Sequence, residues 1–164
     1  KDVVFQSDGV PRINSDKTPA EIILTESGNE YPLTGGWGYS VDTAVEILLD
    51  NGSEGVNFEY WFIKFRAHKE LNFIGNTHPR YGNIDCLDVQ QSLRNVNGKP
   101  YDVLRYIVKA LPVSELGAFD NEWKEHNGFK DDSEGLKNFQ DRVEEKAVGY
   151  QTECWFNISH FYGK

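Results

Sequence analysis

The chain of 164 residues contains no methionine, only two cysteines and no apolar run approaching the ~20 residues that a transmembrane helix needs. Cys86 and Cys154 are too few for a disulfide scaffold, and no CxxC pattern marks a zinc or redox site. We expect two reduced, partly buried thiols, with one long-range disulfide as the alternative. The first residues lack the apolar region of a signal peptide, so the sequence predicts a soluble, cytoplasmic protein without a membrane partner. Because the chain begins without methionine, a removed leader stays an open alternative.

Basic residues are also few, since 17 Lys and Arg stand against 26 Asp and Glu and give a formal net charge of -9. Binding to nucleic acid relies on a basic surface that neutralises phosphates, so this composition argues against a nucleic acid partner. A basic protein partner fits the charge, and acidity that only keeps the protein soluble explains it equally well. Aromatic residues are plentiful at 13%, and a chain of this length can bury a core without metal or disulfide bonds.

The first half of the chain has an ambiguous pattern. Residues 1–19 mix charge and proline with one short apolar run, which predicts a loosely ordered arm before a single domain over residues 20–164. Residues 21–34 contain two apolar runs around Gly28, which is typical of a β-hairpin. Aromatic side chains in residues 56–73 fit both helical and strand spacing, and their enrichment favours a long strand.

The second half has a clearer pattern. Residues 84–96 and 101–111 flank Asn97 and Gly98, which suit the tight turn of a β-hairpin. Both faces of residues 101–111 carry apolar side chains, so this segment is predicted to be a central strand.

Two amphipathic helices and a closing strand follow this hairpin. Apolar residues recur at helical spacing in residues 114–128 and 136–148, and residues 150–162 alternate like a strand. The sequence therefore predicts an α+β fold, with an antiparallel sheet of about five or six strands and the two helices of the C-terminal half packed against it.

The stretch YPLTGGWGYS, residues 31–40, places three glycines around Trp37. It matches neither of the glycine-rich phosphate-binding motifs, because no lysine or helix start follows where a phosphate would need one. A close approach of backbones with Trp37 packed across them is the favoured interpretation. The alternative is a loop that presents Trp37 and Tyr39 to a partner.

No motif for a metal, cofactor or catalytic group is evident. The four histidines lie far apart and belong to no zinc signature, and the paired carboxylates are those expected by chance in an acidic chain. We therefore expect no metal and no cofactor.

Five phrases carry a family resemblance, and they occur in this order: EYPLTGGWGYSVDTAV, GVNFEYWFIKFRAHKEL, YDVLRYIVKAL, HNGFKDDSEG and CWFNIS. Over residues 29–158, the chain resembles a family of small, acidic, uncharacterised bacterial proteins. Some of these are similar to immunity proteins of polymorphic toxin or contact-dependent inhibition systems. The resemblance implies a protein that neutralises a cognate toxin domain, expected to be basic, by stoichiometric binding without catalysis.

The chemistry of interfaces suggests which residues would bind that partner, since aromatic side chains anchor interfaces and charged groups supply steering and specificity. The predicted partner-binding residues are Trp37, Tyr39, Glu122, Glu125, Asp131 and Asp132. One alternative is a small hydrolase with an aromatic-lined pocket and a carboxylate–histidine site. Its residues would be Trp37, Tyr60 and Trp61 with Glu59 or Asp85 and His68. A structural domain without a small-molecule site is the third possibility.

Overall fold

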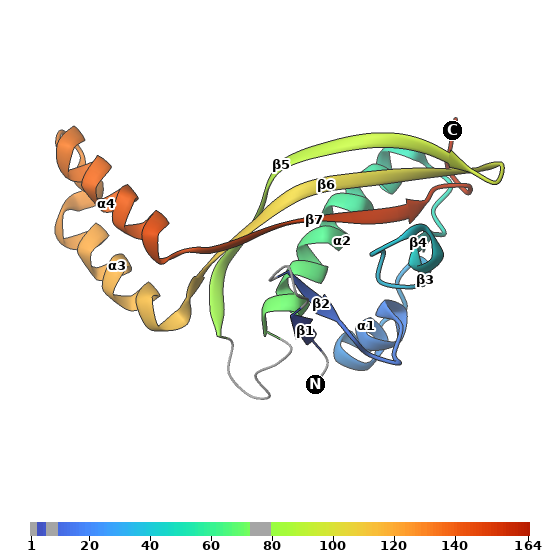
Figure 1. Cartoon of the computed structure of the whole chain (residues 1–164), viewed down its shortest axis with the longest axis horizontal. Coiled ribbons are helices and arrows are strands. Elements are labelled where there is room, and N and C mark those ends of the chain that lie inside the picture. The colour runs from blue at the N-terminus through green and yellow to red at the C-terminus, as the bar shows by residue number, and fades with distance from the viewer. Residues whose placement is uncertain (1–2, 6–9, 73–79) are drawn as a thin grey trace.

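The computed structural model describes residues 3–5, 10–72 and 80–164 and has an α+β fold, which confirms the predicted class (Figure 1). A mixed sheet has the strand order β3-β4-β7-β6-β5. Its strands are β3 (Leu33–Gly35), β4 (Val45–Ile47), β5 (Tyr81–Val96), β6 (Lys99–Pro112) and β7 (Val148–Asn157). The helices are α1 (Pro19–Ser27), α2 (Gly52–Asn72), α3 (Val113–Glu125) and α4 (Ser133–Lys146). Short 3-10 turns cover Val41–Thr43 and Asn127–Phe129.

The predicted hairpin is formed by β5 and β6. Asn97 and Gly98 have φ values of 53° and 79°, so both turn residues lie in the left-handed region that a two-residue hairpin requires. The strand β6 lies between β5 and β7, which confirms that it is central. One pairing differs from the expected antiparallel sheet, because β4 and β7 are parallel, with Val45 opposite Phe156.

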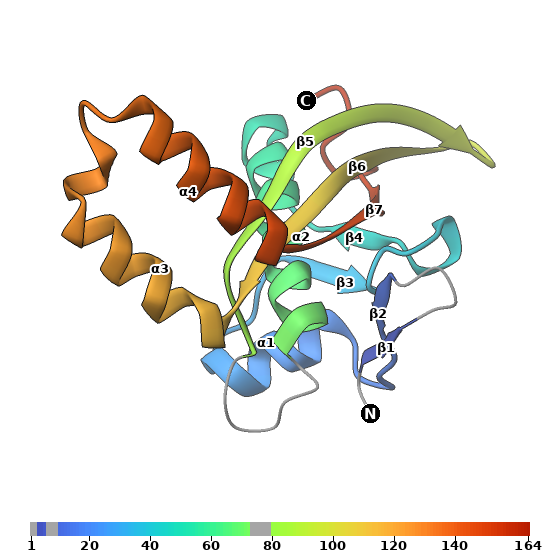
Figure 2. The same cartoon turned by 60° about the vertical axis from the view of Figure 1, so that its left-hand side comes forward.

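The core lies between the sheet and α2, which crosses one of its faces (Figures 1 and 2). Phe62 of α2 meets Phe156 of β7 edge to face, with ring centroids 5.7 Å apart. Burying such large apolar side chains contributes about 1.5–3 kcal/mol each. Leu104 and Val108 of β6 lie on the same face of the sheet and belong to this core.

Two predicted strands are helices in the structure. Residues 19–27 form α1 rather than a hairpin arm, because Thr18 and Glu21 form a reciprocal capping box and Pro19 occupies the first turn. Gly28 ends this helix in the left-handed conformation instead of turning a hairpin. The predicted long strand over residues 56–73 falls mostly within α2, and its last residue lies outside the described residues.

The two C-terminal helices are present as predicted, but they project from the sheet instead of covering a face. In Figures 1 and 2, α3 and α4 extend beyond the ends of β6 and β7 as an antiparallel pair. We call residues 113–146 the arm. Glu122 and Arg142 join its two helices by an ion pair of 2.8 Å, and the rings of Phe119 and Phe139 pack edge to face.

The described part of the N-terminal segment is attached to the rest of the chain. Here β2 (Pro11–Ile13) pairs with β1 (Val3–Phe5) in a separate two-stranded sheet. Ile13 is buried, and its amide donates to the Tyr39 hydroxyl at 2.9 Å. Residues 11–13 are therefore part of the folded body, while the division of the chain at residue 19 stays a prediction.

Candidate functional site

The glycine-rich loop brings the chain against β7. Gly38 has a φ of 86°, and a Cβ atom added there would lie 2.6 Å from Sγ of Cys154. The carbonyl of Gly38 accepts from the amide of Trp155 at 2.7 Å. This close approach of backbones is the arrangement that the sequence favoured.

Trp37 faces inward from this loop. Its side chain is only 6% exposed, and its Nε1 donates to the carbonyl of Lys17 at 3.1 Å. Its ring stacks on Phe65 of α2 with centroids 6.0 Å apart. Trp37 is therefore a core residue, and its predicted contact with a partner stays a prediction that the burial of its ring disfavours.

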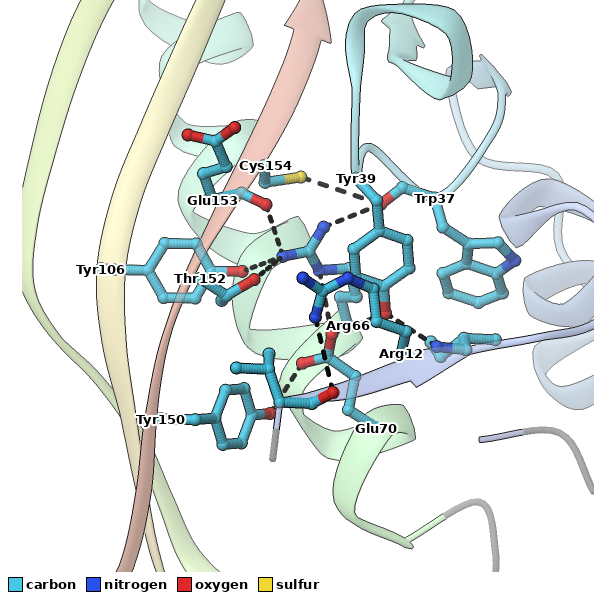
Figure 3. A network of polar contacts seen from close by, with 12 residues as sticks. Arg12, Trp37, Tyr39, Arg66, Glu70, Tyr106, Tyr150, Thr152, Glu153 and Cys154 are labelled. Carbon is cyan, nitrogen blue, oxygen red and sulfur yellow. Dashed lines mark hydrogen bonds and ion pairs between the residues drawn. The ribbon is translucent and has the colours of Figure 1, made fainter. Parts of the chain in front are cut away.

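Arg66 lies at the centre of a buried polar network between α2, the loop and β7 (Figure 3). Its Nη1 donates to the carbonyl of Trp37 at 3.1 Å. Its Nη2 donates to Tyr106 Oη at 3.0 Å, Thr152 Oγ1 at 3.2 Å and the Glu153 carbonyl at 2.8 Å. The side chain thus connects α2 to the loop, to β6 and to β7, and its charge is shared among several acceptors.

Glu70 lies one turn further along α2 and completes the network. Tyr39 and Tyr150 donate their hydroxyls to its carboxylate at 2.6 and 2.7 Å, and Arg66 Nε lies 3.5 Å from it. Burial raises the pKa of Glu70, and Arg66 opposes that rise. Burial also raises the pKa of Tyr39 and Tyr150, and Glu70 adds to this, so both phenols remain protonated donors. The predicted partner residue Tyr39 thus holds Glu70 in place.

A cavity of about 370 Å³ opens beside this network. It is lined by Arg12, Tyr39, Arg105, Gln151, Thr152 and Glu153. Two of these side chains, Tyr39 and Thr152, also belong to the network, so the buried charges lie directly behind the cavity wall.

A second buried pair of ionisable groups lies between α2 and β6. Glu59 is fully buried and Asp102 nearly so. Among the described residues no hydrogen-bond partner reaches the two carboxyl oxygens of Glu59, and the Asp102 carboxyl group lies next to them. Burial and the adjacent Asp102 raise the pKa of Glu59 to about 9. With its pKa raised in this way, Glu59 keeps its proton at neutral pH in the folded protein.

The residues of the hydrolase alternative do not converge. Glu59 is buried and His68 is exposed, and their separation of nine residues along α2 places them on opposite faces of the helix. Phe65 fills the space between Trp37 and Trp61, since it stacks on both rings. The remaining residues, Tyr60 and Asp85, are exposed.

The four predicted acidic residues lie together on the arm, away from the loop that carries Trp37 and Tyr39 (Figure 1). Glu125 and Asp131 are exposed. Glu122 pairs with Arg142 across the two helices, and Asp132 caps α4 by accepting from the Gly135 amide at 2.9 Å. Glu125 and Asp131 are therefore available to a partner, while Glu122 and Asp132 also stabilise the arm.

The arm also contains an apolar groove of about 510 Å³ at its junction with the sheet. It is lined by Asn83, Leu111, Leu116, Gly117, Phe119, Asp120, Trp123, Phe139 and Val143. Trp123 is 43% exposed, which is high for the largest apolar side chain. The sequence indicated these apolar helix faces, but it did not show that a groove remains between them.

The two cysteines are unpaired in the structure, as the favoured prediction has it. Cys86 and Cys154 are free, so the alternative of a disulfide is wrong. Residues 3–5, 10–72 and 80–164 contain no cluster of three or more His, Cys, Asp or Glu that could hold a metal ion. Within the same residues, no helix combines the length and apolar character needed to cross a membrane.

No family model, curated protein or solved structure matches the chain.

Proposed function

We propose that this protein is a non-catalytic immunity protein that binds and neutralises a cognate bacterial toxin domain in the cytoplasm, and that the arm is its main contact surface. The observation that carries the proposal is the charge of the arm. Residues 113–146 contain ten acidic and five basic residues, a net charge of -5 within a chain of -9. These charges lie on a projecting helix pair, where they are accessible to a large partner (Figure 1).

The partner that fits this surface is a basic protein domain. A concentrated negative field accelerates encounter with a cationic surface and disfavours nucleic acid, whose phosphates carry the same sign. The apolar groove beside Trp123 supplies a place for an apolar anchor from the partner, and a half-exposed tryptophan next to a groove is a typical interface hot spot. Charge would then set the rate and specificity of binding, while the groove would hold the complex.

The proposal is tested by capture of the partner from the native host at low salt, followed by reconstitution of the purified pair. The arm variant carries Glu125→Gln and Asp131→Asn, which remove two exposed charges, and asparagine tolerates the positive φ of 68° at residue 131. The control carries Glu30→Gln and Asp50→Asn, two exposed acidic residues outside the arm, with the same change in net charge.

We expect a basic protein that binds the wild type and the control one to one, and whose activity is inhibited by that binding. The arm variant should associate at least several-fold more slowly, with a smaller effect of added salt on the association rate. Equal association rates for the arm variant and the control would refute the role of the arm. A captured protein that keeps its full activity in the complex would refute neutralisation.

A further inference from the structure

The strand β5 forms one edge of the sheet, and it lacks several features that usually protect such an edge. Within the described part of the chain, β6 is the only strand that pairs with β5. Edge strands are commonly protected from pairing by their shortness, by proline or lysine, or by bulges. The opposite edge strand, β3, is only three residues long. In contrast, β5 has 16 residues and contains no proline and no lysine.

The bulges of β5 are confined to its first half. Its pairing with β6 shifts register between Gly82 and Asp85 and again between Leu87 and Gln90. We call residues 90–96 the open edge, since they pair with β6 without a shift and residues 91–95 are exposed. Leu93 is 56% exposed, the highest value for a large apolar side chain among the described residues. The open edge is therefore regular, accessible and partly apolar.

The turn after β5 determines which backbone groups of the open edge point outward. Asn97 and Gly98 form a two-residue turn with positive φ, so Val96 and Lys99 flank it as a hydrogen-bonded pair. Along antiparallel strands, such pairs alternate with pairs that exchange no hydrogen bonds. Every second residue from Val96 back to Gln90 therefore bonds to β6. The residues between them direct their amides and carbonyls away from β6; they are Gln91, Leu93 and Asn95.

These outward groups match those of a second copy of the same strand. Around a twofold axis at Leu93, this residue lies opposite Leu93 of the second copy, and Gln91 lies opposite Asn95. All of these pairs can exchange hydrogen bonds, and the whole open edge is used. An axis one residue earlier would bring the irregular segment 87–90 into the pairing. An axis one residue later would place two copies of Arg94 opposite each other.

The charge of the open edge also favours a second copy. Arg94 is its only charged residue, so the open edge is not acidic although the chain has a net charge of -9. With the axis at Leu93, Arg94 lies opposite Ser92 of the second copy. This pair exchanges no hydrogen bonds, and in such pairs the side chains approach each other most closely. No like charges therefore lie opposite each other in this register.

We propose that two copies of this protein pair through the open edge and form one continuous sheet across a twofold axis at Leu93. This assembly goes beyond the proposed function, because the open edge lies at the end of β5 that is far from the arm (Figure 1). Both arms stay accessible in the dimer. A single pair of strands is a small interface, so we expect a dimer that dissociates on dilution, with a Kd on the order of 10–100 µM.

The test is sedimentation equilibrium of the full chain from micromolar to millimolar concentration, with two substitutions at one exposed position. Ser92→Glu places a carboxylate opposite Arg94 of the second copy, whereas Ser92→Lys places a cation there. The twofold axis repeats each change, so each affects the interface twice. The matched controls are Ser114→Glu and Ser114→Lys, which make the same changes in charge at an exposed serine of α3.

We expect the wild type to dimerise. Ser92→Glu should strengthen the dimer about three- to tenfold, and Ser92→Lys should weaken it about tenfold or more. A general effect of net charge would give the opposite order, because an added lysine reduces the repulsion between two acidic chains. The two Ser114 variants should therefore show at most this weaker, opposite order.

Hydrogen exchange measured by NMR gives a second readout of the same pairing. The amide of Leu93 should become protected as the protein concentration rises, whereas the amide of Arg94 is protected by β6 at every concentration. A wild type that stays monomeric at millimolar concentration overturns the proposal, and the edge is then solvated or paired by another protein. A dimer that responds to Ser92→Glu and Ser92→Lys in the same way as to the Ser114 controls also overturns it.

Discussion

Replacement of Glu59 by glutamine is expected to stabilise the protein at neutral pH. In the folded state the pKa of Glu59 is raised to about 9 by burial and by Asp102, whereas the ordinary value is 4.5. Between these two values the unfolded chain loses the proton and the folded chain keeps it, so stability falls as pH rises. The slope is about 1.4 kcal/mol for each pH unit, which amounts to about 3 kcal/mol between pH 4.5 and 7.

Glutamine has no proton to lose over this range, and its amide can donate a hydrogen bond to the neighbouring Asp102 carboxyl group. The Glu59→Gln variant should match the wild type near pH 4.5 and exceed it by about 3 kcal/mol at pH 7. For a chain of this size, the difference corresponds to a rise of roughly 10 °C in melting temperature.

Urea unfolding at several pH values between 4.5 and 8.5 measures this difference directly. Glu54→Gln is the matched control, since Glu54 is an exposed acid on the same helix and its loss should leave the pH dependence unchanged. A Glu59→Gln variant that is less stable than the wild type at pH 7 would refute the reasoning. So would a difference between the two proteins that stays constant with pH.

Three further substitutions test the remaining contacts by urea unfolding. Arg66→Met leaves the Glu70 carboxylate buried without its cation and should cost about 3–5 kcal/mol, and a loss below about 1 kcal/mol would mean that solvent reaches the network. Gly38→Ala should destabilise clearly more than Gly28→Ala, since both glycines have positive φ but only at Gly38 would the new Cβ clash; equal losses would contradict the close approach. Asp132→Ala removes the cap of α4 and should cost about 0.5–2 kcal/mol, whereas Asp132→Asn should retain most of that stability.

The helix α1 was predictable from the sequence and was still missed. Thr18, Pro19 and Glu21 stand in the order of a capping box, and Gly28 follows at the distance of a helix end. Gly28 after an apolar run indicates a hairpin turn when the helix start signal at Thr18 and Glu21 is left aside. A glycine after an apolar run fits both structures, and the capping box distinguishes them.

The long helix α2 was hidden for a different reason. Its buried positions recur every three or four residues, as in any amphipathic helix, but three of them are Glu59, Arg66 and Glu70. A pattern based on apolar residues treats these positions as exposed, so the helical spacing of the aromatic side chains is no clearer than the strand spacing that they also fit. The same three residues belong to the two buried polar sites. The buried ionisable side chains that hide the helical pattern therefore also make the polar contacts of α2 with its neighbours.

The hairpin of β5 and β6 and the two later helices were predicted correctly, because their turn residues and apolar spacing are local signals. The direction of the arm and the cavity beside Tyr39 were not predictable in this way. Both depend on which strands become neighbours, and that is decided by packing over the whole chain.

The arm begins and ends at adjacent points of the sheet. Ala110 of β6 lies opposite Val148 of β7, and the two strands remain paired as far as Tyr101 and Asn157. In topological terms, residues 113–146 are an enlarged loop of a β-hairpin whose two strands would meet equally well across a short turn. Their sequence can therefore change without altering the register of the sheet. A different helix pair inserted between β6 and β7 would leave the rest of the fold unchanged.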